Sequence, residues 1–547
     1  MSLNYCVLQL SLKTIKSNPV KLIKMKEIKK VFAIGMIVLS AISCKKSEFK
    51  LNESVLNNDQ QIKVQAETYN PVSASAAMIA MGTGFNLGQT FEAADKSTDP
   101  STIYPIIDLY YNAGFRNMRI PTTWMDGFSG NHLASSSGTI NFNHARFIQL
   151  KAVIDYALTK PNMYVVLNTH HEHWLKQYYN GSNTFNTPFA NLWTGIATHF
   201  KDYPNRLLFE VLNEPEGALG DWDNGNGTTV SPNNSIAITL TRQLNKVGYD
   251  AIRATGGNNT TRIVMVSPNA QANTSQFEEV YGTKAMLPGA GNDNYLAVHL
   301  HTYNPWEFCG QYGSNSEYTG RAGIISSVNT VATHAALLGV AVHYGEFGVG
   351  RVPISASERN TWQVREYYRT LRREIIAKNM AATVWDDRGW FALISGNSAT
   401  GYQFVNNIVP TMMAPSIVNK AFTLKGSNDL FVTGANGQDV MRSDRASAGT
   451  WERFYIVDTG TDGGKIALRS MNLFASSENG LVNMNCNRNT IAAFEEFWWE
   501  MNNDGKISLK GNNLNYVSID NANNALRCNK TTIGTTGTEK FTFTLVP

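Results

Sequence analysis

The chain has few cysteines, and their positions argue against a scaffold of disulfides or metal-binding thiolates. Only five occur in 547 residues, and two of them, Cys6 and Cys44, lie in the N-terminal leader. The other three, Cys309, Cys486 and Cys528, are odd in number and lack metal-like spacing. Cys486 and Cys528 can pair only if the fold brings them within bonding distance. The sequence therefore implies no disulfide framework.

Excess charge is also scarce outside the leader. The formal net charge is +4, but seven lysines and one glutamate lie in residues 1–43, so the rest of the chain carries −2. A near-neutral body gives no electrostatic basis for nucleic-acid binding. The hydrophobic fraction of 43%, with 11% aromatic residues, is instead large enough for extensive cores in two or three domains.

Motifs of several common enzyme classes are missing. No glycine-rich dinucleotide or phosphate loop opens a predicted helix, and no G-x-S-x-G elbow is present, which argues against nucleotide and acyl-transfer chemistry. The cluster His170-His171-Glu172-His173 lacks the H-E-x-x-H spacing, and neighbouring residues of a strand point to opposite faces. We therefore predict no catalytic metal and no other cofactor.

The apolar run of the leader is too short to span a bilayer stably. Val31–Ser43 has 13 residues, follows Lys29 and Lys30, and ends in Ala41-Ile42-Ser43-Cys44. This length suits the core of a signal peptide. Small residues before Cys44 resemble a bacterial lipoprotein signal, which implies lipidation of Cys44 and export to an outer membrane or cell surface. An ordinary secretory signal is the alternative.

The segments around this run complete the predicted leader. Met25 is a more natural start than Met1, because residues 1–24 add nothing that a signal peptide needs. Residues 45–75 are polar and lack clear periodicity, which predicts a tether. Membrane contact is then expected only through the lipid.

Between residues 76 and 415, short apolar runs alternate with longer amphipathic segments. The runs predict eight strands, at Met78–Phe85, Arg116–Ile120, Met163–Asn168, Leu207–Leu212, Arg262–Val266, Leu296–His301, Val340–Tyr344 and Ala382–Trp385. The intervening segments predict helices such as Ile103–Asn112, Ala145–Leu158, Phe189–Phe200, Ser235–Ala254, Gly323–Leu338 and Ser357–Lys378. Buried strands that alternate with helices imply a parallel sheet, and eight repeats favour a closed (β/α)₈ barrel, an α/β fold.

Polar side chains follow six of these eight strands. Two strands end in a glutamate, Glu214 after Leu207–Leu212 and Glu346 after Val340–Tyr344. A carboxylate at the tip of a buried strand is costly unless it has a partner or a task. The other residues at strand tips are Arg119, His170, His171, Asn213, His301, Tyr303 and Trp385. Since the carboxyl ends of barrel strands carry the active site, the pattern predicts paired acid chemistry there.

These tips belong to a series of motifs that resembles glycoside hydrolase family 5, the cellulase-type retaining enzymes. The motifs are Gly84-Phe85-Asn86-Leu87-Gly88-Gln89-Thr90, Arg119-Ile120-Pro121, Leu167-Asn168-Thr169-His170-His171, Leu212-Asn213-Glu214-Pro215, His301-Thr302-Tyr303-Asn304-Pro305, Gly345-Glu346-Phe347-Gly348 and Val384-Trp385. The resemblance covers about residues 78–412. Phe85 and Gln89 depart from its common pattern and affect the expected substrate more than the mechanism.

The resemblance implies roles for the residues at the strand tips. Glu214 is expected to be the acid/base and Glu346 the nucleophile, with polysaccharide as the partner. The implied substrate-binding residues are Arg119, His170, His171, Asn213, His301, Tyr303 and Trp385, and of the two adjacent histidines His170 fits the family position better. The first expected activity is an endo-β-1,4-glucanase, and a mannanase, a xyloglucanase and a β-1,3-glucanase are alternatives.

The residue types agree with this chemistry. A retaining glycosidase needs two carboxyl groups about 5–5.5 Å apart, one ionised and one protonated. Asn213 can donate to a sugar 2-hydroxyl, Tyr303 can donate to Glu346, and Arg119 can keep that glutamate ionised. Four further tryptophans near strand tips either extend the cleft or pack: Trp124, Trp174, Trp306 and Trp390. The rival classes are a non-catalytic carbohydrate-binding surface protein and a metal-dependent hydrolase.

Beyond Pro415 the pattern changes to short strands rich in Asn and Gly, with three internal repeats of about 43 residues. The repeats begin at Leu424-Lys425-Gly426, Leu468-Arg469-Ser470 and Leu509-Lys510-Gly511, and they close at Trp451-Glu452, Phe494-Glu495 and Thr538-Glu539. The pattern predicts a β-trefoil over residues 416–547 and is similar to fascin-like and ricin-like modules. That resemblance implies binding of carbohydrate or of a neighbouring surface, although the repeated side chains also suit the module's own core.

Overall fold

The computed structural model describes residues 69–127, 131–220, 230–353, 357–414, 418–459 and 464–546. The predicted signal peptide, Cys44 and most of the predicted tether lie outside these residues. Residues 61–547 form one compact unit, to which all described residues belong. No helix in the described part of the chain is both long and apolar enough to cross a bilayer.

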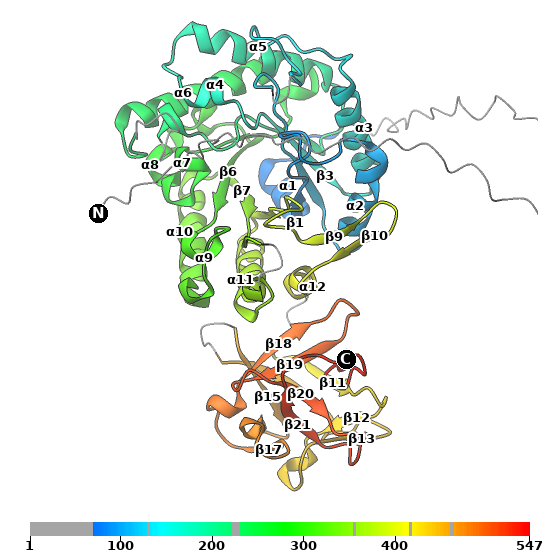
Figure 1. The fold of residues 1–547 in the computed structure, drawn as a ribbon. Helices are drawn as coiled ribbons and strands as arrows, with labels where there is room; N and C mark the ends of the chain where they lie inside the picture. Colours follow the sequence, from blue (N-terminus) through cyan, green and yellow to red (C-terminus); the bar gives the residue numbers. More distant parts are fainter. Residues whose placement is uncertain are drawn as a thin grey trace, which may run out of the picture. The chain divides into compact units, whose positions relative to one another are not determined.

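Eight parallel strands close into a barrel in chain order, β1 to β8, with β8 paired to β1 (Figure 1). The strands are β1 Thr83–Asn86, β2 Asn117–Ile120, β3 Tyr164–Asn168, β4 Leu207–Glu210, β5 Val264–Val266, β6 Leu296–Thr302, β7 Ala341–Phe347 and β8 Ala381–Val384. The predicted (β/α)₈ barrel is therefore confirmed.

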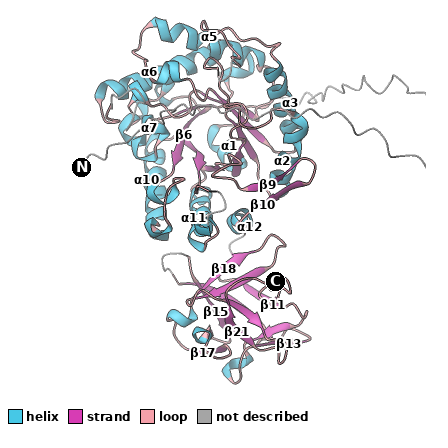
Figure 2. Ribbon diagram, in the orientation of Figure 1, coloured by secondary structure: helices cyan, strands magenta, loops and turns pink. Residues whose placement is uncertain are grey.

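Helices connect the strands and surround the barrel (Figure 2). The longer ones are α2 Pro100–Asn112, α3 Ala145–Thr159, α5 Asn183–His199, α6 Ser235–Ala254, α10 Gly320–Leu338, α11 Trp362–Ala377 and α12 Ile408–Met413. Short turns of helix are α4 His173–Lys176, α7 Asn269–Ala272, α8 Phe277–Val280 and α9 Trp306–Cys309. A hairpin of β9 Ile394–Asn397 and β10 Gly401–Phe404 follows β8.

The first predicted strand, Met78–Phe85, is wrong in its first half. Residues Ala74–Met81 form helix α1, which begins at the N-cap Ser73, and β1 starts only at Thr83. Met78 and Met81 pack against barrel residues such as Leu208 and Met265. The helix buries Ala74, Ala77, Met78 and Met81, but its exposed side also carries apolar residues such as Ile79, so its sequence lacks the periodicity that separates helices from strands.

The strands described in the C-terminal region pair antiparallel, and short 3-10 helices lie between some of them. Its twelve strands are β11 Ala421–Lys425, β12 Phe431–Thr433, β13 Arg442–Arg445, β14 Phe454–Asp458, β15 Ile466–Ser470, β16 Leu473–Ser476, β17 Asn485–Arg488, β18 Phe497–Met501, β19 Ile507–Gly511, β20 Tyr516–Ile519, β21 Leu526–Lys530 and β22 Thr542–Leu545. They enclose a separate apolar core that includes Phe422, Leu468 and Leu509. Cys486 and Cys528 are buried as free thiols, as is Cys309 in the barrel.

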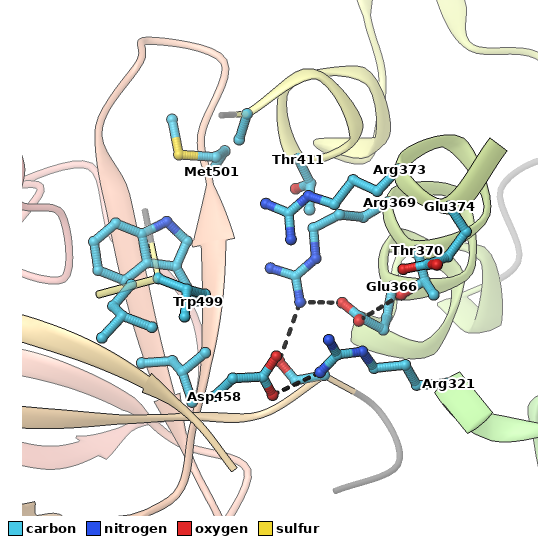
Figure 3. A pocket seen from close by; sticks show the side chains of 15 residues that line it. Arg321, Glu366, Arg369, Thr370, Arg373, Glu374, Thr411, Asp458, Trp499 and Met501 are labelled. Carbon is cyan, nitrogen blue, oxygen red and sulfur yellow. Dashed lines mark hydrogen bonds and ion pairs between the residues drawn. The ribbon is translucent and has the colours of Figure 1, made fainter. Parts of the chain in front are cut away.

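Helix α11 carries the main polar contacts between the barrel and the C-terminal strands. Arg365 pairs with Glu500 at 2.6 Å, both nearly inaccessible, and Trp362 stacks on Trp498 with ring centroids 4.7 Å apart. A small cavity of about 50 Å³ nearby is lined by three arginines and three acids (Figure 3): Arg321, Arg369, Arg373, Glu366, Glu374 and Asp458. Because its positive and negative charges balance, we interpret this cavity as part of the contact between the two regions and not as a ligand site.

Candidate active site

A bulge between β6 and β7 turns Glu346 toward the barrel axis. The pairing runs His299 with His343 and Leu300 with Tyr344, and then skips Gly345 so that His301 lies opposite Glu346. Side chains alternate along a strand, so without this extra residue Glu346 would point away from the axis. The bulge therefore brings Glu346 to the same face as His301.

Arg119 of β2 is the central cation of this face and is fully buried. Its Nη1 donates to Glu346 Oε1 at 2.7 Å and to Asn86 Oδ1 at 2.8 Å. Its Nη2 donates to Asn213 Oδ1 at 2.6 Å, and a two-point contact to Glu210 completes its partners. Burial opposes this charge, but the carboxylates of Glu210 and Glu346 raise the pKa of Arg119 above its usual value. The guanidinium thus contacts four polar residues at once.

Glu346 lies in a pocket of donors. Its Oε2 accepts from the hydroxyl of Tyr303 at 2.9 Å, and its Oε1 accepts from Arg119. Burial raises the pKa of Glu346, while His301, Arg119 and the Tyr303 hydroxyl act in the opposite direction. Hydrogen bonds to a carboxylate favour its charged form, which is the form that a nucleophile needs.

Glu214 has different surroundings. It follows β4 in a left-handed backbone conformation, φ 46°, which is unfavourable for a glutamate and is retained only where the surrounding structure enforces it. Its Oε1 lies 2.9 Å from His301 Nδ1, and its side chain is 23% exposed, against 6% for Glu346. Burial raises the pKa of Glu214 to about 7, with Lys176 and Arg119 acting against it. A carboxyl group with this pKa is mostly protonated below pH 7 and can both donate and accept a proton near neutrality.

The two glutamates are close enough to act on one bond. Oxygens of Glu214 and Glu346, with a nitrogen of His301, all lie within 4.8 Å of one another. This separation is near the 5–5.5 Å of retaining glycosidases and well below the 6.5–9.5 Å of inverting ones. The same three groups would also suit a divalent cation, but Arg119 already supplies the positive charge beside Glu346. The geometry therefore favours a pair of acids over a metal centre.

Asn213 presents an unused donor at this site. Its Oδ1 is taken by Arg119, while its Nδ2 is buried and has no partner among the described residues. A buried amide without a partner is costly, unless a ligand supplies the missing acceptor. The free N–H is therefore placed to meet a substrate hydroxyl.

The two adjacent histidines point to different surroundings. His170 is buried, with its Nδ1 3.1 Å from Asn168 Nδ2, and its ring lies parallel to that of Trp385 at 6.3 Å. His171 stacks instead toward His173, with ring centroids 5.6 Å apart. Of this pair, His170 is therefore the one that lies beside Trp385, and His171 lies toward the outer loop.

The four additional tryptophans separate into packing and surface residues. Trp124 is fully buried and donates to Asn168 O, so of its two predicted alternatives, packing is the one that the structure bears out. Trp306 and Trp390 are 54% and 47% exposed. Trp306 lines a cavity of about 520 Å³, and Trp174 lines another of about 410 Å³ with Met125 and His132. These hollows lie next to residues at the strand tips.

Sequence reasoning missed several polar residues that hold the site together. Glu210 interrupts an apolar strand, and Asn86 lies within a quoted motif, but neither was assigned a role; both bind Arg119. Glu172 accepts from the backbone nitrogens of Trp124 and Asp126 and so organises the loop after β3. A charged residue in an otherwise apolar strand was the available signal for Glu210.

Comparisons with known proteins agree with this geometry. A family model described as "Cellulase (glycosyl hydrolase family 5)" matches residues 79–388. Endoglucanase A of Clostridium longisporum is 30% identical over 355 residues, which cover 60% of this chain and 61% of that protein. Endoglucanase B of Clostridium cellulovorans is 30% identical over 332 residues, which cover 58% of this chain and 68% of that protein.

A solved structure extends the similarity to the fold. It is a complex of a glycoside hydrolase 5 lichenase variant from Caldicellulosiruptor sp. F32 with cellotetraose, with TM-score 0.51 and 26% identity over 63% of this chain and 96% of that one. The match to the C. longisporum enzyme spans about three fifths of that relative's length. The residues that the family model matches, 79–388, include every strand tip described above.

Proposed function

Because the chain belongs to glycosyl hydrolase family 5, we propose that it cleaves β-linked glucan internally with retention of configuration, as an endo-β-1,4-glucanase. The observation that carries this proposal is the pair Glu214 and Glu346, whose oxygens lie within 4.8 Å in environments of opposite character. Glu346 is held by Arg119 and Tyr303, whereas burial raises the pKa of Glu214 to about 7 and so keeps its proton available up to that pH.

In the first step, a carboxylate oxygen of Glu346 attacks the anomeric carbon and forms a glycosyl ester. The bond to the leaving oxygen breaks, its electron pair moves to that oxygen, and Glu214 transfers its proton there. Arg119 and Tyr303 orient the attacking carboxylate through their contacts at 2.7 and 2.9 Å. The free Nδ2 of Asn213 donates to the 2-hydroxyl, a contact that strengthens as charge develops on the sugar.

In the second step, ionised Glu214 removes a proton from water, and the water oxygen attacks the anomeric carbon from the face that the leaving group vacated. The ester bond breaks and returns the electron pair to Glu346. Two displacements at one carbon give net retention. The partial exposure of the Glu214 side chain supports this role, because the leaving group and the water must both reach it.

The choice of glucan rests on the relatives. Several curated relatives carry the name endoglucanase, and the solved lichenase variant binds cellotetraose. The acids themselves do not select a sugar, so mannan, xyloglucan and β-1,3-glucan are the competing substrates. We place the substrate chain along the exposed Trp306 and Trp390, whose flat apolar faces suit pyranose rings.

Hydrolysis of a polysaccharide panel by residues 45–547 tests the proposal. Carboxymethylcellulose, glucomannan, xylan, xyloglucan and a β-1,3-glucan would be compared, with Glu214→Gln as the matched control. Short oligosaccharides from a β-1,4-glucan, formed by the native protein and not by the control, are expected. Retention on insoluble polysaccharide without any cleavage would favour the rival reading, a binding protein on an inactive barrel.

For residues 416–547 we propose a β-trefoil that binds carbohydrate, joined to a catalytic domain over residues 76–415. Strand pairing supports a closed ring of β11, β14, β15, β18, β19 and β22. Three equivalent residues form a cycle of backbone hydrogen bonds, Met441 to Met484, Met484 to Leu526 and Leu526 to Met441. Such threefold repetition is what the three sequence repeats require.

The repeated glutamates of this region are structural. Glu452, Glu495 and Glu539 are buried, and each accepts from a backbone nitrogen, those of Gly449, Ala492 and Gly534. The preceding aromatic residues Trp451 and Phe494 are 37% and 41% exposed and are the proposed sugar contacts. In the inactive Glu346→Ala chain, adding Trp451→Ala and Phe494→Ala should weaken retention on cellulose, whereas Leu545→Ala should not. Equal retention of both would refute the binding role.

We further propose that the chain is exported and anchored through lipidated Cys44. The support is the short apolar run after Lys29 and Lys30 and the small residues before Cys44. Labelled fatty acid should be incorporated by the native protein and not by Cys44→Ala. Release of the native, unlabelled protein into the medium would favour an ordinary secretory signal.

A further inference from the structure

A row of buried hydrogen-bonding side chains runs through the barrel from Glu214, after β4, to Asn117 on β2. His301 Nε2 lies 2.8 Å from His299 Nε2, and His299 Nδ1 lies 3.0 Å from His343 Nδ1. His343 Nε2 lies 2.6 Å from Thr383 Oγ1. His299 and His343 come from the paired strands β6 and β7 (Figure 1), and neither has a part in the mechanism above.

At the far end of this row, the donor and the acceptor of each hydrogen bond can be assigned. Asn117 Nδ2 donates to the carbonyl of Met81 at 3.1 Å, so its Oδ1 is an acceptor. Thr383 donates its single hydroxyl hydrogen to that Oδ1 at 2.7 Å. Thr383 Oγ1 can then only accept from His343, which places a hydrogen on His343 Nε2.

The assignment at Thr383 also fixes the donor and acceptor nitrogens of the histidine rings. Burial lowers the pKa of His343 and His299 well below the usual value, so both rings are neutral and carry one N–H each. With its hydrogen on Nε2, His343 accepts at Nδ1 from His299 Nδ1–H. His299 then accepts at Nε2 from His301 Nε2–H. Each ring therefore dictates the tautomer of the next.

The last hydrogen bond of the row joins His301 to Glu214. Burial also lowers the pKa of His301, to about 4, so this ring is neutral near pH 7 and its Nδ1 is bare. Glu214 Oε1, 2.9 Å away, can make a hydrogen bond to a bare nitrogen only when the carboxyl group is protonated. An ionised Glu214 would face a lone pair instead of an N–H.

Two glycines leave space for this row. A Cβ at position 345 would lie 1.8 Å from His299 Cε1, and one at position 84 would lie 1.8 Å from Asn117 Oδ1. Glu210 Oε2 is 3.6 Å from His299 Nε2, which is beyond hydrogen-bond distance. His301 Nε2, at 2.8 Å, is therefore the hydrogen-bond partner of His299 Nε2.

We propose that Asn117, Thr383, His343 and His299 are positioning residues that fix the tautomer of His301 and thereby hold Glu214 in its proton-donating form. The proposal rests on the assignment of Glu214 as the acid/base above. A carboxyl group that resists ionisation stays loaded for the first step and is a stronger base in the second. The row ends at Asn117, whose amide passes no proton on. It therefore fixes the direction of the hydrogen bonds but does not conduct protons.

Other groups around Glu214 also influence its ionisation. They are the ion-paired Lys176 and Glu216, the paired Arg119 and Glu210, and Glu346 with Tyr303. None of these contacts changes when the hydroxyl of Thr383 is removed, because Thr383 contacts only His343 and Asn117 among the side-chain hydrogen bonds of the described residues. A substitution at Thr383 can therefore alter the row without changing the other contacts around Glu214.

The test compares Thr383→Val with Thr383→Ser in the full chain. Valine keeps the branched shape but offers no acceptor, so His343 should move its hydrogen to Nδ1, the row should reverse, and His301 should present Nδ1–H to Glu214. That N–H favours the ionised form of Glu214 and lowers its pKa. The alkaline limb of the pH profile of kcat/KM on a soluble β-1,4-glucan should therefore move about one pH unit lower. Thr383→Ser keeps the hydroxyl and should leave the limb in place.

Ring-nitrogen NMR of ¹⁵N-histidine-labelled protein supplies a second readout, with the ten histidines assigned by single His→Gln variants. We expect hydrogen on Nε2 of His301 in the native chain and in Thr383→Ser, and on Nδ1 in Thr383→Val. Native His301 with hydrogen on Nδ1, or an unmoved limb in a folded Thr383→Val protein, would overturn the proposal. If no glucan is cleaved by the native chain, the proposed function fails, while the NMR result still decides the tautomers.

Discussion

Arg119 and Glu210 form a two-point ion pair at the centre of the barrel, with Nε 2.6 Å from Oε2 and Nη2 2.8 Å from Oε1. Both side chains are fully buried. Glu210 therefore holds the guanidinium in the one orientation from which it also reaches Glu346 and Asn213. The pair acts on catalysis through the residues that it positions.

Glu210→Gln should destabilise the protein by about 3–5 kcal/mol, because it leaves part of a buried positive charge without its partner. Urea unfolding monitored by tryptophan fluorescence measures the change. Asp250→Asn is the matched control, since it breaks an exposed ion pair with Lys246 and should cost less than about 1 kcal/mol. Similar losses in the two variants would contradict a structural role for the buried pair.

Glu346→Ala should lower kcat by at least about 10³-fold while the protein stays folded, because the variant lacks the nucleophile of the first step. Glu214→Gln should behave differently on a substrate whose leaving group needs no proton. The first step then proceeds without the acid and the second lacks its base, so a glycosyl ester on Glu346 should accumulate. Intact-protein mass spectrometry detects that adduct, and its absence would argue against a covalent intermediate.

The pH dependence of kcat/KM should be bell-shaped. Activity requires ionised Glu346 and protonated Glu214, so it should rise as Glu346 loses its proton and fall above about pH 7 as Glu214 does. Since the two carboxyl groups interact, the limbs report the pair. With an activated leaving group the acid is not needed for glycosylation, and the alkaline limb of kcat/KM should disappear. A persistent limb would assign it to another group.

Asn213→Ala should lower kcat/KM by about 10- to 100-fold, because the donor to the sugar 2-hydroxyl is lost. Asn213→Asp is the informative companion, since it keeps an acceptor near Arg119 but has no N–H to offer. On a 2-deoxy substrate, which lacks this hydroxyl, both variants should have the same kcat/KM as the native protein. An active Asn213→Asp enzyme would show that the contact to Arg119, and not the donor, is what matters.

Much of the barrel and of its strand tips follows from local sequence. Apolar runs bounded by polar residues placed β2 to β8 within a few residues, because buried parallel strands must be apolar and must end where the chain turns back. Both glutamates and Arg119 were identifiable for the same reason, since a charge at the tip of such a strand requires a partner. Their motif order carried the family resemblance.

Other features depended on which strands the closed barrel brings together. His299 and His343 are 44 positions apart in the chain, and both faces of a buried strand are apolar enough that alternation does not reveal which side chains point inward. The bulge at Gly345 reverses that alternation just before Glu346, and no local signal announces it. Helix α1 was predicted as a strand because its exposed side carries apolar residues such as Ile79, and Trp124 could be assigned to packing only once its burial was known. Residue types thus determined which chemistry the chain can perform, whereas barrel closure decided which groups touch Glu214 and hence where its proton resides.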